Sequence, residues 1–112
     1  GVSRAVARAA KEMGAILTIT NRTKERGKDL ANKLDCDYLP WEEKESYKGE
    51  FFINATSIGM GNYELPIDED SIGCYSGIMD VVASNETNLI KVAKNLGLPN
   101  VSGRQMTVYQ AE

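Results

Sequence analysis

Short apolar runs alternate with segments of helical periodicity along this chain of 112 residues. The runs at 15–20, 51–54 and 76–82 are predicted strands, and "CDYL" at 36–39 is a shorter one. Residues 51–54 and 76–82 are largely apolar, as in strands buried on both faces. Strands of this kind that alternate with helices predict an α/β fold, in which helices cover both faces of a parallel sheet.

The predicted helices lie between these strands, at 2–13, 23–33 and 86–96, with one or two helical turns at 41–47, an extended "NVSG" at 100–103 and a last helix from Arg104. Gly14 and Gly97 stand where a left-handed glycine ends a helix. Thr23 can cap the second helix, and Gly27 weakens that helix by roughly 1 kcal/mol relative to alanine.

The start of the sequence is unusual for such a fold. A βαβ unit needs a strand before its first helix, whereas this sequence opens inside that helix or one residue before it. In a doubly wound sheet of order 3-2-1-4-5-6, the missing strand would be the central strand 1. We therefore expect one Rossmann-type domain that lacks its first strand, is part of a larger chain and does not fold alone. In it, 15–20 and 51–54 should not pair directly.

Composition excludes several classes of function. The net charge of −3 gives no overall positive field for nucleic acid or an anionic membrane. No apolar run approaches the roughly 20 residues of a membrane span, and we expect no secretory signal, because the first residues are small, apolar and basic at helical spacing. Cys36 and Cys74 have no histidine to join them in a metal site. We expect two reduced thiols in a cytoplasmic protein rather than a disulfide.

The polar stretch after the second predicted strand carries the clearest chemistry. In a dinucleotide-binding fold this point faces the adenosine ribose, where an acid selects NAD and an arginine accommodates the 2′-phosphate of NADP. Here the sequence reads Asn21-Arg22-Thr23, with Arg26 one helical turn later and no acid before Glu25. Guanidinium groups match phosphate geometry, so the pattern favours NADP. The alternative is a solvated basic helix start in which Glu25 is paired locally.

Four stretches together resemble one enzyme family: "GVSRAVA" at 1–7, "NRTKER" at 21–26, "INATSIGM" at 53–60 and "VSGRQMTVYQA" at 101–111. In their order and spacing they are similar to motifs of the C-terminal, cofactor-binding half of shikimate dehydrogenases. The resemblance covers nearly the whole chain and implies an NADP-binding domain over residues 1–112. It implies reversible hydride transfer between NADPH and the keto group of 3-dehydroshikimate, in the chorismate pathway of aromatic amino acid biosynthesis.

The same resemblance implies where the cofactor is held. The expected cofactor-binding residues are Gly1, Val2, Ser3, Asn21, Arg22, Thr23, Arg26, Thr56, Ser57, Val81 and Gly103. The first three lie beneath the pyrophosphate, and the next four bind the adenosine ribose and its phosphate. Thr56 and Ser57 lie beside the middle of the cofactor, and Val81 and Gly103 lie near the nicotinamide. Gln110 is expected to bind a substrate hydroxyl, whereas Met106 is expected in a helix core.

Two departures from the family pattern bear on activity. Ala83 stands where the family usually has a tyrosine that reaches the substrate carboxylate. The family's catalytic lysine and aspartate lie in an N-terminal substrate domain that no part of this chain matches. We therefore assign no catalytic residue and no metal, and expect no dehydrogenase activity from these residues alone. A quinate or aminoshikimate dehydrogenase, or a non-catalytic ligand-sensing module of the same fold, is the alternative.

Overall fold

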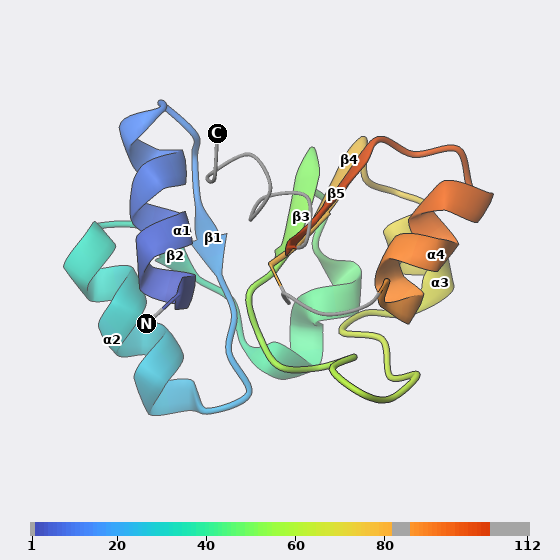
Figure 1. Cartoon of the computed structure of the whole chain (residues 1–112). Helices are drawn as coiled ribbons and strands as arrows, with labels where there is room; N and C mark the ends of the chain where they lie inside the picture. Colours follow the sequence, from blue (N-terminus) through green and yellow to red (C-terminus); the bar gives the residue numbers. More distant parts are fainter. Residues whose placement is uncertain (1, 82–85, 104–112) are drawn as a thin grey trace. The chain divides into compact units, whose positions relative to one another are not determined.

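The computed structural model describes residues 2–81 and 86–103, which form two compact units divided between Tyr47 and Lys48. The first unit contains, in chain order, α1 (Val2–Glu12), β1 (Thr18–Ile19), α2 (Lys24–Leu34), β2 (Asp37–Tyr38) and a 3-10 helix, η1 (Trp41–Ser46). Strands β1 and β2 pair in parallel, α2 packs against both strands, and α1 lies beside α2 (Figure 1). This is the predicted alternation of helix and parallel strand.

Helix α2 packs closely against β2 because it contains a glycine at the point of contact. A Cβ atom added at Gly27 would lie 2.6 Å from Cε1 of Tyr38 and 3.0 Å from Cβ of Asn21. The glycine therefore lowers the helical propensity of α2 but lets the ring of Tyr38 approach its backbone. Ala31 and Leu34 complete the buried face of this helix.

The second unit contains β3 (Phe51–Asn54), α3 (Glu69–Ile72), β4 (Gly77–Asp80), α4 (Asn88–Asn95) and β5 (Asn100–Ser102). The three strands pair in parallel in the order β3-β4-β5, and α3 and α4 contact each other (Figure 1). The core of this unit is apolar and consists of Ile67, Ile72, Tyr75, Ile78, Leu89, Ile90, Val92 and Ala93.

The two sheets agree with the strand order expected for a doubly wound fold. The described strands pair as β1-β2 and as β3-β4-β5, so β1 and β3 belong to different sheets. Within each unit the pairing agrees with the order 3-2-1-4-5-6, with β1-β2 as strands 2 and 3 and β3-β4-β5 as strands 4 to 6. The α/β class and the parallel pairing are confirmed. Gly14 and Gly97 also have the predicted positive φ angles, 91° and 72°.

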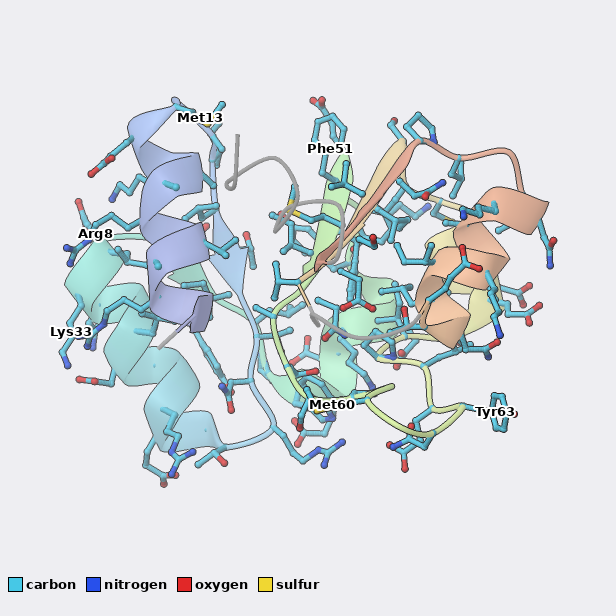
Figure 2. The ribbon with its side chains drawn as sticks, viewed as in Figure 1. Arg8, Met13, Lys33, Phe51, Met60 and Tyr63 are labelled. Carbon is cyan, nitrogen blue, oxygen red and sulfur yellow. The ribbon has the colours of Figure 1, made fainter. Side chains whose placement is uncertain are left out.

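The prediction that 51–54 is buried on both faces is wrong. Phe52 packs against the core, whereas Phe51 is 68% exposed and projects from β3 (Figure 2). Successive side chains of a strand point to opposite faces, and Ile53 shares the exposed face with Phe51. Met13 and Leu96, the last residues of the helices predicted over 2–13 and 86–96, are also exposed.

Two further predictions differ in extent. The strand expected over 15–20 is reduced to Thr18–Ile19. Helix α3 was not predicted, since a helix of four residues gives no periodic pattern. Its N-cap is Asp68, whose carboxylate accepts a hydrogen bond from the N–H of Ser71 at 2.8 Å.

Candidate functional site

The loop that joins β1 to α2, together with the first turn of α2, is called here the arginine loop (residues 20–26). Its turn is made by Asn21, whose Oδ1 accepts a hydrogen bond from the N–H of Thr23 at 2.8 Å. Thr23 occupies the N-cap position of α2, but its side chain makes no capping hydrogen bond, so that prediction is wrong. The Asn21 side chain stabilises the turn before α2. The Thr23 hydroxyl accepts no hydrogen bond from the N–H groups of the first helical turn.

Both arginines of this loop are exposed. Arg22 and Arg26 stand four residues apart, which places them on neighbouring positions of the helix start. Among the residues that the structure describes, no ion pair involves Arg22, Arg26 or Glu25. The alternative in which Glu25 is paired locally is therefore not observed, and the two guanidinium groups are available to an anion.

An aromatic ring that the sequence analysis did not assign to the site lies beside Arg22. The Cζ atom of Arg22 lies 5.7 Å from the centroid of the Trp41 ring, and Nζ of Lys44 lies 4.6 Å from it. Both distances are within the roughly 6 Å of a cation–π contact. Trp41 is half-buried at the start of η1 and restricts the space open to the Arg22 side chain. A tryptophan two positions after the strand predicted at 36–39 was the signal available in the sequence.

The Asn54 loop (residues 54–58) follows β3 and is closed by its own side chains. Asn54 is 1% exposed, and its amide nitrogen donates to the carbonyl of Ile58 at 3.1 Å and to Oδ1 of Asp80 at 3.3 Å. Its Oδ1 accepts from the N–H and the hydroxyl of Thr56, at 3.2 and 2.6 Å. The Thr56 hydroxyl also accepts from the N–H of Ile58 at 3.1 Å. Both the nitrogen and the oxygen of the Asn54 side-chain amide therefore bond to residues of this loop.

Asp80 continues this arrangement from the end of the neighbouring strand. It is 1% exposed, and its Oδ2 accepts a hydrogen bond from the hydroxyl of Thr87 at 2.7 Å. Thr87 is the N-cap of α4, since its hydroxyl accepts from the N–H of Ile90. Asn54, Asp80 and Thr87 thus form a buried polar network that joins the ends of β3 and β4 to the start of α4.

No metal cluster or membrane helix accompanies these loops in the described part of the chain. No three His, Cys, Asp or Glu side chains of residues 2–81 and 86–103 are grouped to hold a metal ion. Over the same residues, no helix has the length and apolarity needed to cross a membrane. Cys36 and Cys74 are free thiols. Burial raises the pKa of Cys36, partly offset by Lys11, and Asp37 and Asp35 raise it further.

The whole chain is similar to known enzymes, although no protein-family model matches it. It is 34% identical over 113 aligned positions to the shikimate dehydrogenase (NADP(+)) of Methanothrix thermoacetophila, covering 98% of this chain and 42% of that protein. The crystal structure of shikimate dehydrogenase from Thermotoga maritima matches with a TM-score of 0.84 and 33% identity, over 97% of this chain and 44% of that one. The chain is homologous to the C-terminal part of the shikimate dehydrogenases.

A third relative has been solved with its ligands. The Thermus thermophilus shikimate dehydrogenase in complex with NADP(H) and shikimate matches with a TM-score of 0.80 and 26% identity, over 95% of this chain and 41% of that one. The resemblance drawn from the four motifs is confirmed by these comparisons. The chain spans about two-fifths of the length of the shikimate dehydrogenases that it matches.

The structure places the other predicted site residues on this shikimate dehydrogenase-like fold as follows. Val2 and Ser3 lie in the first turn of α1. Ser57 is exposed in the Asn54 loop, and the N–H of Val81 donates to the carbonyl of Asn54 at 3.0 Å, so these two lie at the ends of neighbouring strands. Gly103 is buried directly after β5. Outside the described residues lie Gly1, Ala83, Met106 and Gln110.

Sequence reasoning missed the residues of the polar network. Asn54, Asp80 and Thr87 are buried, yet none was singled out. Their signal was present, because "FFIN" and "GIMD" are apolar runs that each end on one polar residue. A polar side chain at the end of a buried strand must find a partner, and the neighbouring strand is the nearest source.

Proposed function

We propose that residues 1–112 form the NADP-binding, Rossmann-type domain of a cytoplasmic shikimate dehydrogenase, which interconverts 3-dehydroshikimate and shikimate in aromatic amino acid biosynthesis. The observation that carries the proposal is the pair of exposed arginines at the start of α2. Neither is paired with an acid among the described residues. Homologues that match nearly the whole chain are NADP-dependent enzymes of this kind, which supports the same cofactor here.

The arginine loop suits the 2′-phosphate of NADP. Guanidinium groups donate paired hydrogen bonds to phosphate oxygens, and Arg22 and Arg26 can approach one phosphate from adjacent positions. The Thr23 hydroxyl and the uncapped N–H groups of α2 add donors for an anion at a helix start. Asn21 would hold the turn while its neighbours bind the ribose and phosphate.

The remaining cofactor contacts fall at the other strand ends. Gly1, Val2 and Ser3 would lie beneath the pyrophosphate, and Val81 and Gly103 beside the nicotinamide. Ser57 is exposed and free to approach the middle of the cofactor. The Thr56 hydroxyl donates to Asn54, so we assign Thr56 the shaping of this loop rather than a donated hydrogen bond to the cofactor.

The chemistry divides between this domain and the substrate domain. NADPH, when bound, supplies a hydride to the substrate carbonyl. Proton transfer at that carbonyl needs a group within hydrogen-bond reach, and we assign it to the lysine and aspartate of the family's N-terminal domain. In this domain we assign substrate contact to Gln110 alone.

The second candidate function rests on Ala83. Alanine cannot donate a hydrogen bond to the substrate carboxylate, so an enzyme for a related acid, such as quinate or aminoshikimate, is the alternative. A non-catalytic ligand-sensing module is the third candidate.

An assay of the full-length natural protein separates these candidates. Shikimate, quinate and aminoshikimate are each oxidised with NADP+ and with NAD+, and reduced cofactor is followed by absorbance. We expect the highest kcat/KM with shikimate and NADP+. A higher value for quinate or aminoshikimate would favour the second candidate, and ligand binding without turnover the third. A preference for NAD+ would contradict the role given to the arginine loop.

A further inference from the structure

The polar network lies where a doubly wound sheet binds its ligands. Asn54 and Asp80 are partners in register, and each is the last residue of its strand. Ligands of such sheets bind outside the carboxyl ends of the strands. Both side chains are almost fully buried, so they meet each other and the Asn54 loop rather than solvent.

Stability alone is a poor reason to bury these groups. Apolar side chains of similar volume often replace buried polar or ionic networks without loss of stability. Here such a replacement would leave the N–H of Thr56 and the carbonyl of Ile58 without the partner that Asn54 provides. The network therefore determines the conformation of the loop that carries Thr56 and Ser57.

Asp80 fixes the orientation of the Asn54 amide. A carboxylate only accepts hydrogen bonds, so the NH2 group of Asn54 must face Asp80 and its oxygen must face Thr56. The reverse orientation would place two acceptors against each other and would also turn the NH2 group toward the N–H of Thr56.

The start of α4 also lies beside residues 59–63, which follow the Asn54 loop. Gly59 has a φ of +94°, and a Cβ atom added there would lie 3.7 Å from Cβ of Thr87. The amide nitrogen of Asn88 donates to the carbonyl of Tyr63 at 3.3 Å. Thr87 therefore lies beside Gly59, in the segment after the Asn54 loop, while its hydroxyl donates to Asp80.

We propose that Asp80 is a positioning residue for the nicotinamide side of the cofactor, acting through Asn54 and Thr87 on the Asn54 loop. The proposal rests on the proposed function, because it needs NADP to lie along the strand ends. Asp80 itself touches no ligand in this scheme. It sets the backbone of residues 55–58, and that backbone and Ser57 face the cofactor.

The test compares two ligands in the full-length protein. Adenosine 2′,5′-bisphosphate carries only the part of NADP assigned to the arginine loop, whereas NADP+ carries the whole cofactor. In Asp80→Asn we expect the Kd of the bisphosphate to stay within about twofold. The Kd of NADP+ should rise about tenfold, as when one hydrogen bond to a charged group is lost. Asp70→Asn, an exposed acid of the same unit, is the control and should change neither Kd.

A second pair of variants keeps the test decisive if Asp80→Asn folds poorly. Thr87→Val removes the hydroxyl donated to Asp80, and Thr87→Ser keeps it. We expect Thr87→Val to raise the ratio of the Kd of NADP+ to the Kd of the bisphosphate severalfold. Thr87→Ser should leave this ratio at the value of the unmodified protein. If variants of Asp80 and Thr87 lower the melting temperature but leave that ratio unchanged, the network is structural only and the proposal is wrong. If the unmodified protein binds neither ligand, the proposed function fails first.

Discussion

The arginine loop and the Asn54 loop both follow the carboxyl end of a parallel strand, yet different forces hold them. The first has one asparagine-to-backbone hydrogen bond at its turn and two exposed guanidinium groups. The second is built around an asparagine that is 1% exposed and makes four hydrogen bonds. The guanidinium groups of the arginine loop stay hydrated until an anion replaces the water. The Asn54 loop offers only neutral groups to a ligand, so its conformation must be fixed before the ligand binds.

Asn54→Leu should have the largest effect and tests whether the Asn54 loop depends on its buried amide. The substitution removes the hydrogen bonds that Asn54 makes to the N–H of Thr56 and to the carbonyl of Ile58. A buried group that loses its partner costs roughly 1–3 kcal/mol, so the free energy of unfolding should fall by about 2 kcal/mol or more. Urea-induced unfolding of the full-length protein measures this.

The matched control for this variant is Asn95→Leu, the same substitution at an exposed residue of α4. It should change the free energy of unfolding by less than about 0.5 kcal/mol. Equal effects of Asn54→Leu and Asn95→Leu would show that the Asn54 loop does not depend on the buried amide of Asn54.

Arg22→Ala tests whether the arginine loop works by charge. The Kd of NADP+ should rise about 10- to 100-fold, equivalent to roughly 1–3 kcal/mol, while the Kd of NAD+ changes little. The difference should shrink as salt is added, because the side chain is exposed. Arg26→Ala should act in the same direction less strongly, and Lys91→Ala, which removes one exposed positive charge elsewhere, should leave the ratio unchanged. Equal weakening of both cofactors by Arg22→Ala would contradict the assignment.

Trp41→Leu tests how far the arginine loop is preorganised. Loss of an exposed cation–π contact is worth about 0.5–1 kcal/mol, so the Kd of NADP+ should rise about two- to fivefold. Trp41→Phe should retain most of the affinity, because it keeps an aromatic face. The effect should vanish in an Arg22→Ala background, and a full effect in that background would show that Trp41 acts on something else.

Cys36 gives the smallest and most local test, since it follows α2 in the same unit as the arginine loop. Its raised pKa favours the neutral thiol in the folded protein, so the stability that this provides is present at neutral pH. It is lost as the pH rises through the folded-state pKa, above the ordinary value of about 8.5. Alkylation by iodoacetamide at pH 7.5 should therefore be slower at Cys36 than in urea-unfolded protein, as read by mass spectrometry. Equal rates would show that this unit does not protect the thiol.

The sequence predicted what depends on neighbours along the chain. The helix over 86–96, the glycine ends at Gly14 and Gly97, and the run from Asn21 to Arg26 are local patterns, and the structure places them as expected. The parallel pairing within each unit also followed, because crossover rules leave few arrangements for alternating strands and helices.

What could not be predicted depends on contacts between distant residues. Asn54 and Asp80 are 26 positions apart, and their hydrogen bond exists only once β3 and β4 are in register. The contact of Arg22 with Trp41 depends on the path of the chain into η1. The exposure of Phe51 depends on which face of the sheet the apolar core covers, and a run of apolar letters does not contain that information.

Gly27 connects the stability of the first unit to its recognition chemistry. Protein engineers often replace a helical glycine by alanine, because the added methyl group narrows the freedom of the unfolded chain. At this position the methyl group would collide with the ring of Tyr38 and press on Asn21, the residue that makes the turn before Arg22. Gly27→Ala would therefore raise the helical propensity of α2 but displace the turn that carries the arginines. Evolution cannot stabilise α2 in this way and also keep the proposed preference for NADP.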